Sequence, residues 1–599
     1  MAVGKTLTAE QLMKNTKYLL PSLSRDNMKL LFASDEGGVP NTCEMDMREG
    51  SVRKLTDSGE PVYPMGYAGN GSRFLFAKDE GGNELFHIYL QDGDRCTDLT
   101  DARGAVAHFF TWNEDRSGFF FTWNRRDNRF FDLWHMDLDN MDKVMVYENG
   151  RYNIGAVDLS GSLVALELEN TGNDSDIYLY DGKTGTEKLL TPHSGEVKFS
   201  AAGFSRDGSR LFMLTDEGRE FRYLAVLDLN TLEREELMVF QGDVRGVSFS
   251  DDCKKMAVLA GIKGSTGLFI RDMDTGSDRE VKGLPKGQTM SPRFSPDNTF
   301  LTFVAGTSAR PEDIHVLSLG SDELRRVTRA LNPEVDPEDL TEGTYREFES
   351  FDGLRVPGIL YRPQDASVSE PVPAVVFVHG GPGGESVLFY TPMIQLMVNH
   401  GFAVFCVNNR GSSGYGKTFF RAADHRHGEV DLDDCVWAGK YLRSLPFVDP
   451  GRVGIMGGSY GGYMTLAALA FRPDAFKVGV DLFGISNWLR TLREMPVWWG
   501  AHREVLLRKI GDPDTEEEYL RSISPLFHYG NIRKPLLVIQ GANDPRVLQA
   551  ESDEIVEKVR EAGVPVEYVL FDDEGHGFRK KSNQITADDA IVGFLEEYL

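Results

Sequence analysis

The stretch VGIMGGSYGGYM, Val453 to Met464, decides the fold of the second half of this chain. Four glycines flank a single serine, although glycine is costly in regular structure, so the backbone there must follow a path that side chains would block. Before the serine, RVGIM has the apolar character of a buried strand, and YMTLAALA after it is typical of a helix. The pattern Gly-x-Ser-x-Gly over 457–461 therefore predicts a tight strand-to-helix turn that exposes the hydroxyl group of Ser459.

Outward from this turn, strands alternate with helices. Such alternation is typical of a mostly parallel sheet with helices on both faces, and we expect a domain of this kind over residues 345–599. The expected strands are 374–381, 402–410, 452–458, 477–483, 534–541 and 566–572, with helices at 431–445 and 585–599. Active sites in such sheets lie beyond the carboxyl ends of the strands.

A serine hydroxyl needs a base beside it and an acid that orients the base before it can act as a nucleophile. On this kind of sheet the expected chain order is serine, acid, histidine. His576, in DDEGHGF, directly follows the last strand, and Asp544, in GANDPRV, follows the strand before it. We therefore predict Ser459, Asp544 and His576 as a catalytic triad. Asp572 and Asp573 are rival acids in the loop of His576.

A tetrahedral intermediate also needs hydrogen-bond donors for its oxyanion. The backbone N–H of Tyr460, the residue after the nucleophile, is one expected donor. The second is expected from the glycine-rich loop after the strand AVVFVHGG, which runs from His379 to Gly384. Glycine lets that backbone approach a substrate, whereas the alternative is a plain flexible loop.

A different pattern fills the first half of the chain. The phrase FS-x-D-G, followed by alternating apolar residues, recurs with variations at a spacing of 44 to 47 residues. Its occurrences lie at Ser24, Ala68, Asn113, Asp158, Ser205, Ser250 and Ser295. Most units contain a second hairpin signal, and four short strands per repeat are typical of a propeller blade. We therefore predict a seven-bladed β-propeller over residues 15–330.

Two short segments complete the expected organisation. LNPEVDPEDLTEG is acidic and carries two prolines, so residues 331–344 are expected to link the two domains. Residues 1–14 precede the propeller and are expected to pack on the second domain.

Composition narrows the classes of partner. A net charge of −27, from 65 basic and 92 acidic residues, disfavours binding to nucleic acid or to an anionic membrane. The first twenty residues lack the pattern of a secretion signal, and no apolar run is long enough to span a bilayer. The five cysteines show neither zinc-finger spacing nor a CxxC pair. We expect reduced thiols in a cytoplasmic protein that needs no metal or organic cofactor.

Five motifs resemble those of the prolyl oligopeptidase family of serine peptidases, and above all its acylaminoacyl-peptidase branch. They are HGGPGG, NNRGSSGYG, GGSYGGYM, GANDPRV and EGHGF. The family places a propeller before an α/β-hydrolase domain, so the resemblance covers nearly the whole chain. It implies the same triad. It also implies that Arg546 binds a backbone carbonyl of the substrate, a task that suits the guanidinium fork.

The resemblance also points to substrate-binding positions. The prolyl oligopeptidase and dipeptidyl peptidase branches carry a tyrosine where this chain has His379, which favours a backbone oxyanion donor such as Gly381. The family's pocket for the residue before the scissile bond implies roles for Trp488, Trp498 and Trp499, although ordinary core aromatics suit the same pattern. No match is found to the propeller glutamates with which dipeptidyl peptidases hold a free amino terminus.

We therefore expect a serine peptidase that hydrolyses short or N-acylated peptides, with a propeller that excludes folded proteins by size. Its expected partners are short peptide substrates, and assembly into a homo-oligomer is left as an alternative to a monomer. Activity should decline below about pH 6, as the imidazole of the base becomes protonated. Three alternatives remain. They are an esterase or other acyl hydrolase with the same triad, a dipeptidyl or prolyl-specific peptidase, and a propeller interaction protein with an inactive hydrolase domain.

Overall fold

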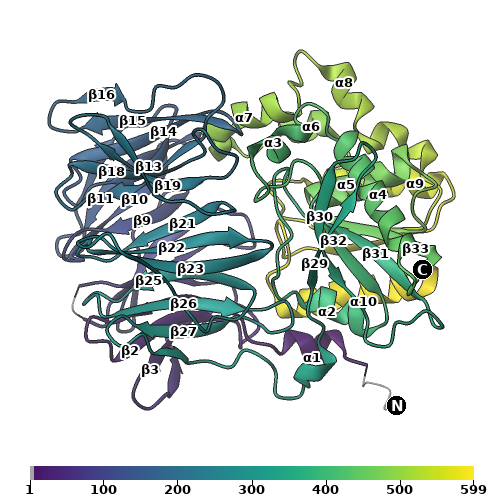
Figure 1. The fold of residues 1–599 in the computed structure, drawn as a ribbon, viewed down its shortest axis with the longest axis horizontal. Helices are drawn as coiled ribbons and strands as arrows, with labels where there is room; N and C mark the ends of the chain where they lie inside the picture. Colours follow the sequence, from purple (N-terminus) through teal and green to yellow (C-terminus); the bar gives the residue numbers. More distant parts are fainter. Residues whose placement is uncertain (1–5, 70) are drawn as a thin grey trace.

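The computed structural model describes residues 6–69 and 71–599, which form two domains lying side by side (Figure 1). The first domain is made of seven four-stranded antiparallel sheets, and the second is built on one eight-stranded sheet. The fold class predicted from the repeat and from the strand-helix alternation is thereby confirmed.

Each blade consists of four strands that follow one another in the chain. In chain order the blades comprise β1 (Tyr18–Leu23), β2 (Lys29–Ser34), β3 (Asn41–Asp46), β4 (Val52–Lys54); β5 (Tyr63–Tyr67), β6 (Phe74–Lys78), β7 (His87–Asp92), β8 (Arg95–Asp98); β9 (Ala107–Trp112), β10 (Gly118–Asp127), β11 (Phe130–Asp137), β12 (Lys143–Tyr147); β13 (Asn153–Val157), β14 (Leu163–Thr171), β15 (Asp174–Asp181), β16 (Thr186–Leu189); β17 (Phe199–Phe204), β18 (Arg210–Thr215), β19 (Tyr223–Asp228), β20 (Arg234–Met238); β21 (Val244–Phe249), β22 (Lys255–Ile262), β23 (Ser265–Asp272), β24 (Asp278–Glu280); and β25 (Gln288–Phe294), β26 (Phe300–Gly306), β27 (Asp313–Ser318), β28 (Leu324–Arg326).

The recurring phrase forms the turn between the first two strands of a blade. In four blades its serine hydroxyl donates to the aspartate two residues later, at 2.6 Å. The residue after that aspartate is left-handed, with φ from 56° to 69°, a conformation that favours glycine and asparagine. The turn residues are Ser24, Asp26 and Asn27; Ser205, Asp207 and Gly208; Ser250, Asp252 and Cys253; and Ser295, Asp297 and Asn298.

The ring closes where the last blade meets the first. Leu23 and Phe32 of blade 1 share an apolar cluster with Val304 of blade 7. At the same seam, Thr302 Oγ1 donates to the carbonyl oxygen of Pro21 at 3.0 Å. A lone hairpin is marginal in water, so burial of each blade against its neighbours stabilises the ring.

The second domain has the strand order β29-β30-β32-β31-β33-β34-β35-β36. Its strands are β29 (Thr344–Glu349), β30 (Arg355–Tyr361), β31 (Val372–Val378), β32 (Ala403–Val407), β33 (Val448–Gly458), β34 (Gly479–Leu482), β35 (Leu536–Gly541) and β36 (Val566–Phe571). The six strands from β31 to β36 are parallel, whereas β29 and β30 are antiparallel additions at one edge. The sequence analysis missed these two strands. β29 is an exposed edge strand with few buried side chains, whereas β30 is buried along nearly its whole length.

Helices cover both faces of this sheet. The helices α4 (Val430–Ser444), α5 (Tyr460–Phe471) and α9 (Gln549–Glu561) pack on one face, and α1 (Ala9–Met13), α2 (Pro392–Asn399) and α10 (Lys581–Tyr598) on the other. The shorter elements are α3 (Lys417–Phe420), α6 (Trp488–Arg493), α7 (Gly500–Ile510) and α8 (Glu517–Ser522), with 3-10 turns η1 (Pro337–Asp339), η2 (Arg421–Ala423), η3 (Val497–Trp499) and η4 (Pro525–Asn531).

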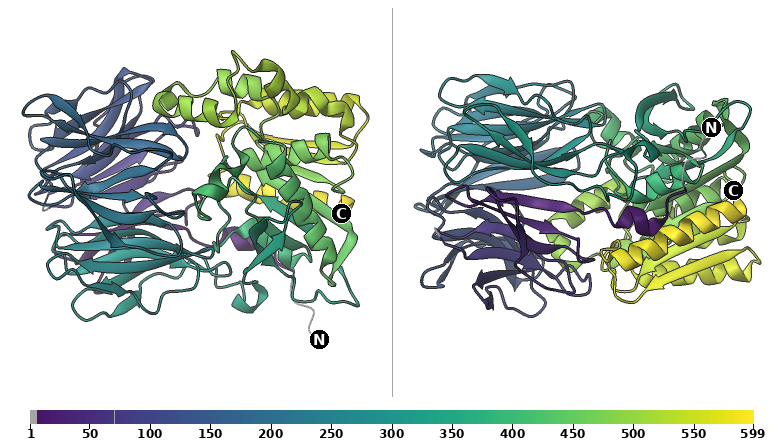
Figure 2. Two further views of the ribbon diagram at one scale, coloured as in Figure 1. Left: turned by 45° about the horizontal axis from the view of Figure 1, so that its top comes forward. Right: turned by 90° about the horizontal axis from the view of Figure 1, so that it is seen from below.

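The two segments outside the domains both contact the second domain. Residues 1–5 lie outside the described residues, and Leu7, just before α1, is buried in the apolar cluster beneath α2 and α10. Figure 2 shows α1 beside α10. In the segment 331–344, Val335 and Leu340 are buried in the same cluster. This segment therefore packs on the second domain along part of its length.

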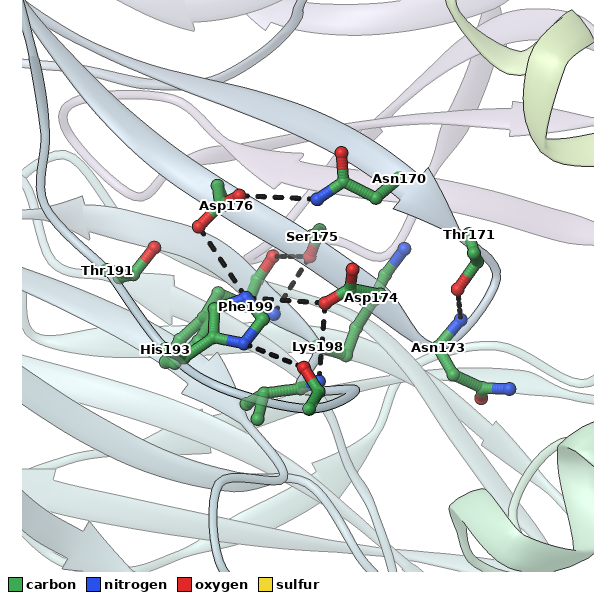
Figure 3. Close-up of polar contacts among 12 residues, drawn as sticks. Asn170, Thr171, Asn173, Asp174, Ser175, Asp176, Thr191, His193, Lys198 and Phe199 are labelled. Carbon is green, nitrogen blue, oxygen red and sulfur yellow. Dashed lines mark hydrogen bonds and ion pairs between the residues drawn. The ribbon is translucent and has the colours of Figure 1, made fainter.

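Blade 4 contacts the second domain at α7. His502 Nδ1 of α7 lies 3.5 Å from a carboxylate oxygen of Glu169 in β14. In the same blade, His193 Nε2 lies 3.3 and 3.6 Å from oxygens of Asp174 and Asp176 (Figure 3). These contacts tie the connection between β16 and β17 to β15.

Two further features concern membrane-spanning helices and the state of the cysteines. Among the described residues, no helix is long and apolar enough to cross a membrane. All five cysteines are free thiols. Cys43, Cys406 and Cys435 are buried, Cys253 is partly buried and Cys96 is exposed.

Candidate active site

Ser459 lies at the sharp turn between β33 and α5, at the carboxyl end of β33. Its backbone has φ 57° and ψ −118°, which is uncommon for a residue with a side chain. The flanking glycines are required by close packing. A Cβ atom would lie 2.4 Å from the carbonyl oxygen of Val378 if placed on Gly457, and 2.0 Å from it if placed on Gly461. The turn is therefore tight and strained, as the Gly-x-Ser-x-Gly pattern predicts.

Three loops bring Ser459, Asp544 and His576 together. They follow β33, β35 and β36, which are parallel and so end at the same edge of the sheet. His576 Nε2 lies 3.0 Å from Ser459 Oγ, and His576 Nδ1 lies 2.6 Å from Asp544 Oδ2. This is the arrangement of a nucleophile, a base and an orienting acid.

The carboxylate of Asp544 is held from its other side by the backbone. Its Oδ1 accepts hydrogen bonds from the N–H groups of Arg546 and Val547, at 2.8 and 2.9 Å. The residue is 3% exposed, so the carboxylate is shielded from water and keeps one fixed orientation toward the imidazole. The rival Asp573 is instead exposed and pairs with Lys580 at 2.7 Å, which lowers the pKa of its carboxyl.

Phe483 contacts His576 and was missed by the sequence analysis. It follows β34, and its ring lies edge to face against His576, with 5.0 Å between the ring centroids. Its backbone N–H donates to the carbonyl of Ile539 at 2.8 Å, and its φ is 43°. The ring restricts the orientation of the imidazole, yet no local pattern distinguishes this phenylalanine from any other apolar residue at a strand end.

The glycine-rich loop His379–Gly384 lies beside Ser459. A Cβ atom on Gly380 would be 3.6 Å from Ser459 Cβ. Gly381 has φ 149°, and a Cβ atom there would lie 2.5 Å from the backbone nitrogen of Gly383, so the loop can fold only with glycine at this position. The loop and the start of α5 thus face the same reaction centre, although the roles of the N–H groups of Gly381 and Tyr460 stay predictions.

His379, which opens this loop, uses both ring nitrogens within the protein. Its Nε2 lies 2.7 Å from Ser412 Oγ, and its Nδ1 lies 2.8 Å from the carbonyl oxygen of Gly380. Burial lowers the pKa of this imidazole, so it is neutral near pH 7. These contacts fix the loop to the segment after β32.

A loop of the propeller rests directly on the two loops that carry Asp544 and His576. This docking loop, residues 79–86 between β6 and β7, was not predicted to take part in the site. Asp79 pairs with Arg579 at 2.7 Å, and Asn543 Nδ2 donates to the carbonyl of Gly81 at 3.1 Å. Gly82 leaves no room for a side chain, because a Cβ atom would lie 2.6 Å from the backbone nitrogen of Gly575.

Glu84 of the docking loop pairs with Arg546, the residue implied to bind a substrate carbonyl. Arg546 Nε lies 2.9 and 3.0 Å from the two carboxylate oxygens of Glu84. Glu84 is 8% exposed and has φ 61°, which is uncommon for glutamate. The pair joins the two domains beside Asp544. Sequence analysis missed Glu84, because only the fold brings a propeller turn to this loop.

The three tryptophans implied as pocket residues lie in different surroundings. Trp488 is 3% exposed and packs in the core against Tyr463, with 5.1 Å between the ring centroids. Trp499 is partly buried, and the guanidinium of Arg546 lies 5.9 Å from its ring centroid. Trp498 is partly buried in the turn η3. Of the three, Trp499 is the one placed against Arg546.

Comparisons with known proteins agree with this geometry. The model of the N-terminal β-propeller domain of prolyl oligopeptidase matches residues 67–326, and that of the prolyl oligopeptidase family matches residues 389–599. Dipeptidyl aminopeptidase BIII of Pseudoxanthomonas mexicana is 30% identical over 88% of this chain and 78% of its own length. The chain belongs to the prolyl oligopeptidase family. The predicted membership is confirmed, and with it the prediction of a serine peptidase.

Further proteins match along nearly the whole chain. Dipeptidyl peptidase family member 6 of Caenorhabditis elegans is 26% identical over 98% of this chain and 86% of its own. Among solved structures, a puromycin-hydrolyzing peptidase of Mycobacterium tuberculosis has a TM-score of 0.85 at 19% identity, covering 99% of this chain and 96% of that one. An acylaminoacyl peptidase of Pyrococcus horikoshii has a TM-score of 0.73 at 21% identity, covering 99% and 98%. At this identity the structural matches bear on the fold alone.

Proposed function

We propose that this chain is a serine exopeptidase that removes short amino-terminal units, above all dipeptides, from small peptides. The observation that carries the proposal is the Arg546–Glu84 pair beside Asp544. A carboxylate held at the site suits the ammonium group of a free amino terminus, and the terminal nitrogens of Arg546 suit a backbone carbonyl. The names of two sequence relatives, a dipeptidyl aminopeptidase and a dipeptidyl peptidase family member, support this choice.

In the proposed mechanism, Ser459 Oγ attacks the carbonyl carbon of the scissile bond while His576 Nε2 takes its proton. Asp544 holds the imidazole in the required tautomer and stabilises the imidazolium that forms. The backbone N–H groups of Tyr460 and Gly381 donate hydrogen bonds to the oxyanion. His576 then protonates the leaving amine. A water molecule, deprotonated by the same imidazole, releases the acyl group from Ser459.

The proposal includes selection of substrates by size and shape. The docking loop lies on the catalytic loops, so the propeller shields the site on this side and restricts it to short peptides. Trp499, next to Arg546, is proposed to contact a substrate side chain, and Trp488 and Trp498 are proposed to shape the same pocket. Five free thiols suit the reducing conditions of the cytoplasm, which is the proposed location.

A second candidate is an acylaminoacyl peptidase. Because Arg546 already neutralises Glu84, the pair carries no net charge, and a neutral pair also suits an uncharged N-acyl group. The histidine at 379, with both nitrogens engaged inside the protein, fits the backbone oxyanion donor implied for that branch.

A set of chromogenic substrates separates the candidates. The set contains the 4-nitroanilides of alanyl-alanine, acetyl-alanyl-alanine and acetyl-alanine, with 4-nitrophenyl butyrate as the ester. The proposal predicts the highest kcat/KM for alanyl-alanine anilide, at least about ten-fold above its acetylated form, because only the free amine forms a charged hydrogen bond with Glu84.

The variant Glu84→Gln keeps an oxygen for Arg546 but removes the carboxylate charge. It should lower kcat/KM for alanyl-alanine anilide about ten-fold and change that for acetyl-alanine anilide less than about three-fold. Glu80→Gln is the control, because Glu80 belongs to the same loop and is exposed. A preference for acetyl-alanine anilide, insensitive to Glu84→Gln, would favour the second candidate. Hydrolysis of the ester alone would contradict both.

A further inference from the structure

Tyr460, the residue after Ser459, is anchored in the protein interior through its hydroxyl group. The side chain is 2% exposed, and its hydroxyl donates to Asp431 Oδ2. The same hydroxyl oxygen lies 2.6 Å from His427 Nδ1. Burial, and then the charge of Asp431, raise the pKa of Tyr460 well above its ordinary value, so the phenol keeps the proton that it donates.

Asp431 is a fully buried carboxylate held by two backbone N–H groups, by Tyr460 and by His427. Its Oδ1 accepts hydrogen bonds from the backbone N–H groups of Gly428 and Leu432, both at 2.8 Å. Its Oδ2 accepts from Tyr460 and lies 3.2 Å from His427 Nδ1. The residue stands in the first turn of α4, where the helix dipole favours a negative charge.

His427 completes the network from the loop before α4. It is 1% exposed, and its Nε2 has no hydrogen-bond partner in the part of the chain that the structure describes. Because Nδ1 faces the Tyr460 oxygen and Asp431 Oδ2, we assign a proton to it, which it donates to the Tyr460 oxygen and toward Asp431. The tyrosine hydroxyl is thus a donor to one buried residue and an acceptor from the other, which allows a single orientation.

Apolar packing alone would leave this orientation less defined. Around the Tyr460 ring lie Tyr463 and Trp488, with centroid distances of 5.3 and 6.2 Å. Such contacts bury the ring, but they are non-directional. The strained backbone of Ser459 persists only if its surroundings over-determine it. The residue next to it is held by two directional contacts that come from a different helix and the loop before it.

We propose that Asp431 and His427 are positioning residues, which hold the Tyr460 side chain by its hydroxyl and thereby fix the backbone N–H of Tyr460 toward the developing oxyanion. The inference rests on the proposed function, in which that N–H is an oxyanion donor. A displacement of about 1 Å at a reaction centre can cost about 100-fold in rate, so a side-chain anchor one residue from the nucleophile acts on kcat.

The test compares Tyr460→Phe and Asp431→Asn with Asp433→Asn. Tyr460→Phe removes one oxygen atom and keeps the ring, so it stays informative even if Asp431→Asn fails to fold. Asp433 stands in the same helical turn but pairs with Arg472 at 2.9 Å in a partly exposed position, which makes it a matched control. For each protein we would measure kcat and KM on alanyl-alanine anilide, the inhibition constant of a peptide trifluoromethyl ketone, and the thermal midpoint. The ketone adduct on Ser459 carries an oxyanion, so its affinity reports on the donors.

Tyr460→Phe and Asp431→Asn should each lower kcat about 10- to 100-fold, less than removal of an oxyanion donor, and weaken the ketone by a similar factor. KM should change less than about three-fold, because the lost interaction belongs to the transition state. The double variant should lose no more than the worse single variant, since both substitutions break one contact. The control should stay within about two-fold of the wild type in all kinetic constants.

Three results would overturn the inference. They are an unchanged kcat in Tyr460→Phe, a kcat loss without weaker ketone binding, and a lowered thermal midpoint as the sole effect. A wild-type protein that neither cleaves the anilide nor binds the ketone would instead refute the proposed function itself. An active wild type with unaffected variants would refute the positioning role alone.

Discussion

Replacement of Asp544 by asparagine should invert the hydrogen-bonding pattern of the base. Asp544 Oδ1 accepts from two backbone N–H groups, so the amide oxygen of the new asparagine takes that place. The amide nitrogen then stands where Oδ2 was, 2.6 Å from His576 Nδ1, and offers a hydrogen. Two donors cannot face each other, so the imidazole adopts the tautomer with its proton on Nε2. That nitrogen, 3.0 Å from Ser459 Oγ, can no longer take a proton.

The expected loss is large because the base is removed while the geometry is kept. Wrong-tautomer substitutions of this kind lower kcat by about 10⁴, which corresponds to about 5 kcal/mol in the activation free energy. The thermal midpoint should change little, because the amide still accepts both backbone hydrogen bonds. The assay is steady-state hydrolysis of the best anilide, with active-site titration to exclude traces of wild-type enzyme.

Asp573→Asn is the control for Asp544→Asn. Asp573 lies in the loop of His576 but pairs with Lys580 in an exposed position. The kcat of the Asp573→Asn variant should therefore stay within about two-fold of the wild type. A loss below about 100-fold in Asp544→Asn, or a comparable loss in Asp573→Asn, would refute the assignment of Asp544 as the orienting acid.

Three further predictions concern stability. Burial raises the pKa of Asp481 from 3.8 to about 7. Between these pH values the folded protein keeps a proton on this carboxyl that the unfolded chain has released, so folding becomes less favourable as pH rises. Wild-type stability should therefore fall by about 4 kcal/mol between pH 4 and pH 8 relative to Asp481→Asn, and parallel denaturation curves at all pH values would contradict this. Gly461→Ala forces a Cβ atom to 2.0 Å from the Val378 carbonyl and should destabilise by about 1–3 kcal/mol, whereas Gly593→Ala, with open space around it, should not, as paired urea titrations would show. Arg579→Met leaves the buried Asp79 without its cation and should destabilise by about 3 kcal/mol, and an unchanged thermal midpoint would show that the docking loop does not depend on this pair.

Local chemistry explains what the sequence could predict. The blades were predictable because most of them repeat a turn in which a serine, asparagine or aspartate is followed three residues later by a left-handed position, a conformation that favours glycine or asparagine. The group of Ser459, Asp544 and His576 was predictable because parallel strands end at one edge, so residues that follow different strands converge. In both cases the signal lies within a few residues of the chain.

The missed features depend on contacts between distant segments. Glu84 reaches Arg546 across 462 positions of sequence, and only the placement of the propeller on the second domain makes that pair. Phe483 touches His576 because β34 lies between β33 and β35 in the sheet. Asp431 lies in the first turn of α4, where the helix dipole alone accounts for an acidic residue, so its contact with Tyr460 could not be predicted.

The most direct test of the account is covalent labelling with a fluorophosphonate, followed by mass-spectrometric mapping of the adduct. The account predicts one phosphonylated residue, Ser459, with labelling slowed at least about 100-fold in His576→Ala, because a serine hydroxyl reacts only when a base takes its proton. An adduct on another serine, or equal labelling of the two proteins, would contradict the claim that Ser459, His576 and Asp544 act together.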